Sequence, residues 1–333
     1  MVGCVRRTRR HRGGLSQMNA GSPPTLAVFG EVLVEIMRPE VGMPLSKPGV
    51  FRGPFASGAP AIAASAAANL GAAVTFAGVV GDDPFGQLCI DTMRGYGVDV
   101  AGVHVDASRT TGMAFVAYED DGSRSFLFHV RDAAAGQLIP AAVDRLADTT
   151  FDWLHVSGSS LAMSDDMRDT ALAAVTHAQA CGARIALDPN VRPEVLSANA
   201  LRELLGPIVR AADVLLPSGD EACLLADVDD PVAASRVLAT TGKTVILKDG
   251  AHGARVFDEA SGSDNVLVEA KTATPADPTG AGDVFSAAYA VAVLEGKTPI
   301  EATYFAHAAA ACAIETFGPM EGLPNRAAVE SRL

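Results

Sequence analysis

Nine consecutive residues near the C-terminus combine a glycine-rich turn with an acidic side chain at the start of an expected helix. The segment is residues 277–285, DPTGAGDVF. Because Gly280, Ala281 and Gly282 carry little or no side chain, a ligand can approach their backbone N–H groups at the positive end of a helix dipole. Asp283 adds a carboxylate beside this anion-favouring loop, which suits a general base acting next to a phosphate. The alternative is an N-terminal helix cap, in which a side-chain oxygen of the segment accepts backbone N–H bonds.

The elements that must position this segment follow a strand–helix rhythm from Thr25 onward. We expect strands at residues 26–30, 73–80, 153–157, 184–188, 214–217, 244–248 and 254–257. The best helices are expected at residues 61–70, 85–96, 166–181, 231–241, 284–294 and 300–316. This alternation predicts an α/β fold with a doubly wound, mostly parallel sheet covered on both faces. In such sheets ligands bind beyond the carboxyl ends of the strands.

Two stretches interrupt the rhythm, at about residues 32–56 and 109–130. The second contains two β-rich runs on either side of an acidic turn that ends in Gly122, which is typical of a hairpin. Together the two stretches could form a small β-sheet that stands off the main domain as a lid over the crevice. An ordinary edge hairpin is the alternative.

Length and composition restrict the class of protein. The chain has 333 residues, of which 49% are hydrophobic and 20% are charged, which suits one large α/β domain or two domains. Its five cysteines are scattered and lack a CxxC spacing, which argues against a disulfide framework and a zinc site and favours a reducing cytoplasm. No stretch of about 18 strongly apolar residues is present, so a membrane span is not expected.

Charge is distributed unevenly along the chain. Residues 1–24 hold five arginines and no acid, whereas the remainder holds 21 basic and 39 acidic residues, a net charge of −18. Such a body repels a polyanion, so no nucleic-acid partner is expected. The basic leader could be a nucleic-acid arm or a targeting peptide, but a short arginine cluster is more typical of a disordered extension. Residues 25–333 are then expected to form the functional domain.

The nonapeptide resembles the C-terminal signature of the PfkB (ribokinase-like) family of carbohydrate kinases. Further segments resemble the family in the same order along the chain, namely residues 57–62 with 69–71, 79–86 and 187–192. The resemblance spans about residues 26–318 and implies a Rossmann-like fold with a β lid. It implies ATP with Mg²⁺ as phosphoryl donor and a small-molecule sugar as acceptor. Asp283 would activate the sugar hydroxyl, and the backbone of residues 280–282 would neutralise the γ-phosphoryl group.

The resemblance also assigns residues to the sugar side. Glu35 falls where the family usually has an Asp that holds sugar hydroxyls, although it could equally be a charge on the lid surface. Gly58 matches the second glycine of the family's Gly-Gly motif, and Ser57 replaces the first. Ile62 replaces an Asn that often contacts the sugar, and this departure puts the substrate pattern in question. Residues 61–70 could otherwise be only a tightly packed Ala-rich helix.

On the nucleotide side, Ser218 replaces the Asn of the family's NxxE element, and Glu221 would order water around magnesium or simply be a helix first-turn acid. Residues 248–253 would place nucleotide phosphate and ribose, or form a plain hairpin turn. His307 lies where many relatives have an Asn near adenine, although a packed or surface histidine is the commoner explanation. The resemblance thus assigns the nucleotide side to Asn190, Ser218, Glu221, Lys248, Gly250, Gly253, Thr279 and His307.

The sugar itself is less determined. Residues 188–193 and 155–158 resemble the branch with fructokinases, 2-keto-3-deoxygluconate kinases and tagatose kinases. Residues 53–62, 217–221 and 318–322 are most similar to tagatose kinases. This favours transfer to a primary hydroxyl of a ketohexose. A sugar acid would need a cation for its carboxylate, and Arg131 and Arg192 are available. A need for a monovalent cation such as K⁺ stays open, and exposed lid strands make a homodimer reasonable.

Two functions of other classes remain. A nicotinamide-dependent oxidoreductase would use a similar sheet, but Gly30-Glu31-Val32 follows the first strand in place of a GxGxxG turn. A sugar-binding protein that has lost catalysis is suggested by Ile62 and Ser218 at unusual positions.

Overall fold

The computed structural model describes residues 23–120, 123–138, 146, 150–191 and 197–333. The expected basic extension therefore lies almost wholly outside the described residues.

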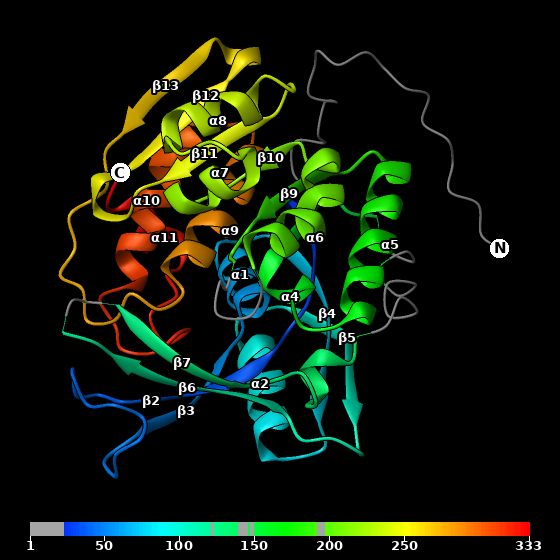
Figure 1. Ribbon diagram of the computed structural model, residues 1–333, viewed down its shortest axis with the longest axis vertical. Coiled ribbons are helices and arrows are strands. Elements are labelled where there is room, and N and C mark those ends of the chain that lie inside the picture. The colour runs from blue at the N-terminus through cyan, green and yellow to red at the C-terminus, as the bar shows by residue number, and fades with distance from the viewer. Residues whose placement is uncertain (1–22, 121–122, 139–145, 147–149, 192–196) are drawn as a thin grey trace.

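A nine-stranded sheet passes through the middle of the molecule (Figure 1) in the order β13-β12-β11-β10-β9-β8-β1-β4-β5. The run from β11 to β5 is parallel, and β12 and β13 add an antiparallel edge. The strands are β1 (Thr25–Phe29), β4 (Ala73–Gly81), β5 (Asp99–Asp106), β8 (Trp153–Ser157), β9 (Arg184–Asp188), β10 (Val214–Leu215), β11 (Thr244–Lys248), β12 (Ala254–Asp258) and β13 (Ser263–Val268). The mostly parallel doubly wound sheet is as expected.

Both faces of the inner part of this sheet are buried, because successive side chains of its inner strands enter different cores. In β1, Leu26 and Val28 belong to one core, and Ala27 and Phe29 belong to the other. The first core contains residues of α1 (Ala59–Asn69), α2 (Pro84–Gly95), α9 (Ala281–Leu294), α10 (Pro299–Ala313) and α11 (Arg326–Glu330). The second contains residues of α4 (Gly158–Leu161), α5 (Asp165–Cys181), α6 (Ala198–Ala211), α7 (Gly219–Ala226) and α8 (Pro231–Ala239). Figure 1 shows these two sets of helices on opposite sides of the strands.

The four remaining strands form a separate sheet in the order β3-β2-β6-β7, at the lower end of the molecule in Figure 1. They are β2 (Leu33–Met37), β3 (Arg52–Ser57), β6 (Gly112–Tyr118) and β7 (Arg124–His129). The predicted hairpin is confirmed, since β6 and β7 pair antiparallel. It does not lie on an edge of the main sheet, because β6 instead pairs in parallel with β2.

Most element predictions agree with the structure, and the differences have local causes. Strands β5 and β13 were not predicted because most of their residues are at least partly exposed, so they lack an apolar run. Helix α6 was missed although its hydrophobic pattern is amphipathic, and it contains Pro207, which usually ends a helix. Helix α9 begins at Ala281 rather than at Val284, so part of the glycine loop is the helix's first turn.

Among the described residues, no helix combines the length and apolarity needed to cross a bilayer.

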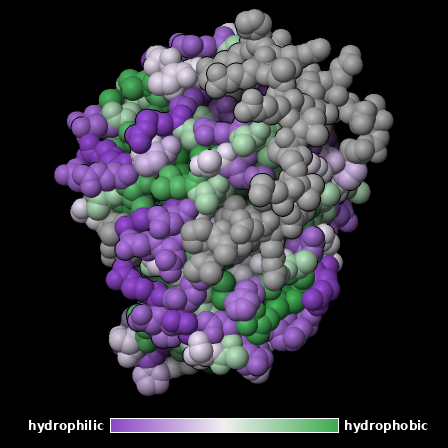
Figure 2. All heavy atoms as spheres, turned by 90° about the vertical axis from the view of Figure 1, so that its right-hand side faces the viewer, coloured by the Kyte–Doolittle hydropathy of each residue, from purple (hydrophilic) through white to green (hydrophobic). Residues whose placement is uncertain are grey.

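The face drawn in Figure 2 is largely hydrophilic where it is coloured, with smaller hydrophobic areas between the polar residues. Three short 3₁₀ turns complete the described structure, at Ala134–Gly136, Gly250–His252 and Glu259–Ser261.

Candidate active site

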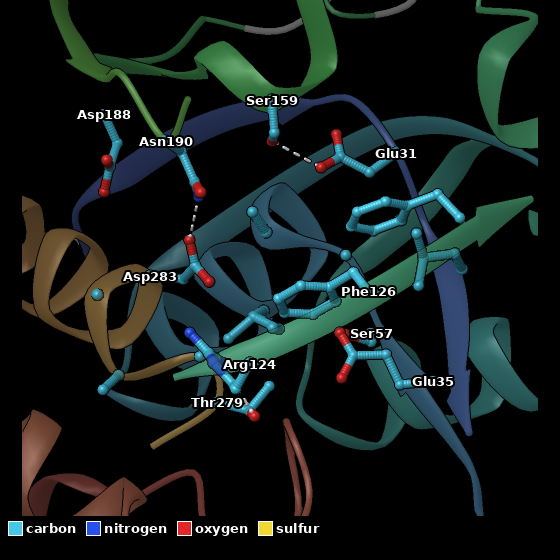
Figure 3. Close-up of a pocket in the computed structure, with 18 of the residues that line it drawn as sticks. Glu31, Glu35, Ser57, Arg124, Phe126, Ser159, Asp188, Asn190, Thr279 and Asp283 are labelled. Atoms are coloured by element: carbon cyan, nitrogen blue, oxygen red, sulfur yellow. Dashed lines mark hydrogen bonds between the residues drawn. The ribbon is translucent and has the colours of Figure 1, made fainter. Parts of the chain in front are cut away.

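A cavity of about 530 Å³ lies between the small sheet and the carboxyl ends of the main-sheet strands. Loops after β1, β9 and β10 contribute Glu31, Asn190 and Ser218. Helix α4, which follows β8, contributes Ser159, and the end of β11 contributes Lys248. This is the edge of the sheet where the crevice was expected. The small sheet contributes residues of β2, β3 and β7 from the other side (Figure 3).

The glycine loop forms one wall of the cavity, to which residues 278–283 all contribute. Gly280 is the N-cap of α9 and has φ 78°, a left-handed conformation that favours glycine. A Cβ at this position would also lie 3.3 Å from the Ile62 side chain. The first turn of a helix leaves its N–H groups without partners inside the helix. The N-cap residue itself, Gly280, has no side chain with which to cap α9.

Asp283 is the third residue of α9 and lines the cavity. Its Oδ1 accepts a hydrogen bond of 2.9 Å from Nδ2 of Asn190 (Figure 3). Asn190 follows β9, so it meets Asp283 from another wall. The structure therefore brings together two residues that the sequence had assigned to different tasks.

Lys248 and Asp188 form a buried ion pair beside the glycine loop. The Lys248 Nζ donates to Asp188 Oδ2 over 2.7 Å, and the Ser286 hydroxyl donates to the same oxygen over 2.6 Å. Burial alone would lower the pKa of Lys248, but the Asp188, Glu221 and Asp283 carboxylates raise it above its ordinary value. The Nζ lies 3.8 Å from where a Cβ of Gly282 would be. A permanent positive charge therefore adjoins the loop's N–H groups.

Glu221 lines the cavity while serving the local backbone. Its Oε2 accepts from the Ser218 N–H over 2.7 Å and its Oε1 accepts from the Val191 N–H over 3.0 Å. Glu221 therefore is an acid in the first turn of α7, as its alternative interpretation expected. Each carboxylate oxygen has two lone pairs, so these bonds leave Glu221 able to accept from water as well. Ser218 also lines the cavity.

The small sheet supplies a second carboxylate. Glu35 of β2 is 8% exposed and accepts a 2.8 Å hydrogen bond from the Ser57 hydroxyl of β3. Glu35 is therefore not a charge on the lid surface. Gly58 has φ 112°, and a Cβ there would lie 2.5 Å from the Glu31 carbonyl oxygen, so this position requires glycine. Ile62 is buried and also lines the cavity.

Not every predicted residue reaches the cavity. Gly250 lines it, whereas Gly253 instead packs against the Val268 carbonyl, where a Cβ would be 2.2 Å away. His307 is buried in α10 with its ring 5.0 Å from that of Phe285, and burial lowers its pKa to about 4. His307 is thus a packed histidine outside the cavity described. Arg131 is exposed and lines the cavity, while Arg192 lies outside the described residues.

Several lining residues were not predicted. Glu31 is almost fully buried and accepts a 2.7 Å hydrogen bond from the Ser159 hydroxyl. Arg124 and Phe126 both enter the cavity from β7, and Arg124 donates to the Thr279 hydroxyl over 3.1 Å. The alternation of Arg124, Phe126 and Phe128 along one strand is the signal that could have identified this inward face.

The buried Asp277 carboxylate connects the small sheet to the glycine loop. It is 1% exposed and accepts from the Tyr118 hydroxyl of β6 over 2.8 Å. It also accepts from the backbone N–H groups of Thr279, over 2.9 Å, and Gly318, over 3.0 Å. Asp277, the first residue of the nonapeptide, therefore has a structural role rather than a ligand-binding role.

The comparisons with known proteins agree with this geometry. The model of the "pfkB family carbohydrate kinase" matches residues 24–326. The chain is 32% identical to a "Probable fructokinase-7" of Arabidopsis thaliana, covering 93% of this chain and 92% of that protein. It is 33% identical to a "2-dehydro-3-deoxygluconokinase" of Thermoproteus tenax, covering 93% and 94%.

Solved structures give the same result. A "putative Ribokinase II in complex with ATP and Mg+2 from E.coli" superposes with a TM-score of 0.85 at 35% identity, covering 93% of this chain and 98% of that one. A fructokinase from Vibrio cholerae O395, "in fructose, ADP and calcium ion bound form", has a TM-score of 0.80 at 27% identity, covering 93% and 99%. The match over almost the whole chain shows that this protein belongs to the PfkB family of carbohydrate kinases and is a sugar kinase.

Proposed function

We propose that the protein transfers the γ-phosphoryl group of ATP to a primary hydroxyl of a ketohexose such as tagatose or fructose. The observation that carries the proposal is the position of Asp283, on the first turn of α9 and inside the cavity. The Glu35–Ser57 pair lies in the same cavity, on the small sheet. The fructokinase names of several relatives support a ketose as acceptor.

The chain's own residues supply the acid–base and electrostatic parts of the reaction. The Asp283 carboxylate takes the proton of the acceptor hydroxyl as the hydroxyl oxygen attacks the γ-phosphorus, the bond from the γ-phosphorus to the bridging oxygen breaks and ADP leaves. The N–H groups of the loop and the Lys248 ammonium offset the charge on the transferring group. Glu35 accepts hydrogen bonds from other sugar hydroxyls, so the reacting hydroxyl is held in line with the phosphorus.

The residues present fit ATP with Mg²⁺. No three His, Cys, Asp or Glu side chains gather into a metal cage in the described part of the chain. Mg²⁺ needs none in such enzymes, because it keeps several waters and binds substrate phosphates with one or two carboxylates. Glu221 is the carboxylate that would order this water. Bound Mg²⁺ would supply charge neutralisation at the phosphates.

We further propose that residues 32–56 and 109–130 act as a lid on the domain of residues 25–333. Their side chains line one side of the cavity, including Phe126 and Arg124. Closure over the acceptor would exclude water and so prevent wasteful hydrolysis of ATP.

A second acceptor, 2-keto-3-deoxygluconate, is favoured by one observation. Arg131 lines the cavity and is exposed, so its guanidinium could bind a sugar carboxylate. The relative from Thermoproteus tenax carries the corresponding name.

A sugar panel with ADP detection tests the proposal, with tagatose, fructose and 2-keto-3-deoxygluconate each added to enzyme, ATP and Mg²⁺. We expect ADP only when a sugar is present, with a ketohexose giving the highest kcat/KM. Asp283→Asn should lower kcat by at least about 10³-fold while the Kd for ATP stays within about threefold. Full activity of that variant would refute the assignment of the base. ADP formed equally without sugar would refute the kinase reaction.

Three further properties belong to the same proposal. A homodimer through the small sheet is supported by exposed apolar side chains of Phe51 and Leu127, and analytical ultracentrifugation tests it. A cytoplasmic location is supported by the four described cysteines, all of which are free thiols, and cell fractionation tests it. A monovalent cation requirement is tested by replacing K⁺ with tetramethylammonium in the assay.

A further inference from the structure

The side-chain amide of Asn190, a residue expected to bind nucleotide, contacts the candidate base. Nδ2 donates to Asp283 Oδ1 over 2.9 Å, across 93 residues of sequence (Figure 3). We infer that Asn190 is a positioning residue that fixes the orientation of the Asp283 carboxylate toward the acceptor hydroxyl. The inference rests on the proposed role of Asp283 as the general base.

The backbone on both sides of Asn190 is held in place. Asp188 before it is bound by Lys248 and Ser286, and the N–H of Val191 after it donates to Glu221. A donor attached to such an anchored segment can fix the direction of a partner more firmly than one on a free loop.

The conformation of Asn190 explains why this residue type suits the position. Its φ of 40° lies in the left-handed region, which asparagine and glycine adopt more readily than other residues. Of these two, only asparagine carries an amide that can reach Asp283. The preceding turn also passes very close to α4, since a Cβ on Gly158 would lie only 1.9 Å from the Pro189 carbonyl oxygen. The close approach leaves the segment little room to relocate.

The orientation of a carboxylate matters because the torsion that turns its plane is soft. A hydrogen bond to Oδ1 restricts that rotation and so directs the lone pairs of Oδ2. Near-attack geometry is sensitive to such details, and a displacement of about 1 Å can cost about 10²-fold in rate. Asn190 therefore acts on kcat through Asp283, while the affinity for ATP and sugar depends on other groups.

Two variants separate donation from space filling. Asn190→Gly keeps the left-handed backbone accessible and removes the amide, and Asn190→Asp keeps the size but replaces the donor with an acceptor. We expect each to lower kcat by about 10- to 100-fold with KM for ATP and sugar within about threefold. Asn265→Gly is the matched control, because Asn265 also has a left-handed φ, 64°, but lies on β13 and does not line the cavity. The control should keep the wild-type kcat.

A double-mutant cycle gives a readout that a purely structural role would not produce. If Asn190 acts through the base, Asn190→Gly should cause no further loss in an Asp283→Ala background. Multiplying losses would overturn the inference, as would a wild-type kcat in Asn190→Asp. Should Asn190→Gly not fold, the same cycle is run with Asn190→Asp. If Asp283→Ala itself retained full activity, the proposed role of Asp283 as the base would be refuted. If Asp283→Ala lowered kcat as expected but Asn190→Gly lowered it further in that background, only the inference about Asn190 would be refuted.

Discussion

The hydrogen bonds between the small sheet and the glycine loop depend on the Asp277 carboxylate. Substitutions of Asp277 and its partners should therefore lower the free energy of unfolding to different degrees. Asp277→Ala leaves three donors without their acceptor, namely the Tyr118 hydroxyl and the N–H groups of Thr279 and Gly318. Hydrogen bonds to charged groups contribute about 1.5–3 kcal/mol each, and solvent entering the space returns part of that. We therefore expect a loss of about 3–5 kcal/mol in the free energy of unfolding.

The amide isostere has a smaller effect that the geometry also predicts. In Asp277→Asn, Oδ1 can still accept from Tyr118 and Thr279, but Nδ2 then faces the Gly318 N–H, donor against donor. The flipped amide is worse, because it opposes two donors. The expected loss is about 1–3 kcal/mol, the cost of one unsatisfied buried group. Tyr118→Phe removes one donor and keeps the carboxylate, so about 1 kcal/mol is expected.

Urea unfolding monitored by tryptophan fluorescence measures this series. The chain has a single tryptophan, Trp153, which is fully buried in β8 and reports the loss of the main sheet. The order of midpoints should be wild type, Tyr118→Phe, Asp277→Asn and then Asp277→Ala. Asp264→Asn, at an exposed acid on β13, is the control and should change the midpoint little, because its ion pair with Arg236 is exposed to solvent. A wild-type midpoint for Asp277→Asn would refute the reasoning.

The remaining predictions concern charge and acceptor binding. Burial lowers the pKa of His155 and His307 from 6.5 to about 4. The unfolded chain therefore takes up these protons first, and the free energy of unfolding falls as pH drops from 6.5 towards 4, by up to about 3 kcal/mol for each histidine. Urea midpoints across this range should show a shallower pH dependence for His307→Asn than for the wild type. Lys248→Met should lower kcat/KM for ATP by about 10²-fold and also lower the thermal midpoint, because Asp188 stays buried without its cation; adding Asp188→Asn should restore the midpoint but not the activity. Glu35→Gln should raise KM for the sugar by about tenfold and leave KM for ATP unchanged, and an equal change in both constants would contradict its assignment to the acceptor.

The parts of the site that could be predicted from the sequence are those in which neighbours in space are also neighbours in the chain. The loop at residues 280–282 and Asp283 are contiguous, so a helix that begins there places the carboxylate beside the N–H groups without any further information. The strands at residues 153–157, 184–188 and 244–248 could be predicted equally well, because each is an apolar run buried on both faces. Their loops were therefore expected at one edge of the sheet.

The contacts that could not be predicted join residues far apart in the sequence. Asn190 and Asp283 are 93 residues apart, Lys248 and Asp188 are 60 apart, and Tyr118 and Asp277 are 159 apart. Each depends on the order of strands and on how the small sheet is placed, which side-chain periodicity does not report. Glu35 illustrates the limit, since only the pairing of β2 with β3 brings Ser57 within reach of its carboxylate and shows that it faces the cavity.

The proposed base on the first turn of α9 creates an electrostatic problem that Asp188 would help to solve. The proposed reaction places the Lys248 ammonium near the transferring group, but the ammonium is also attracted to Asp283, whose charge contributes to the raised pKa of Lys248. A direct ion pair between them would occupy the carboxylate that must accept the proton. Asp188 holds the ammonium from the sheet side, and the Asp188 oxygen that binds Lys248 also accepts a hydrogen bond from the Ser286 hydroxyl of α9. In the proposed reaction the positive charge would then act on the phosphoryl group without a direct ion pair between Lys248 and Asp283.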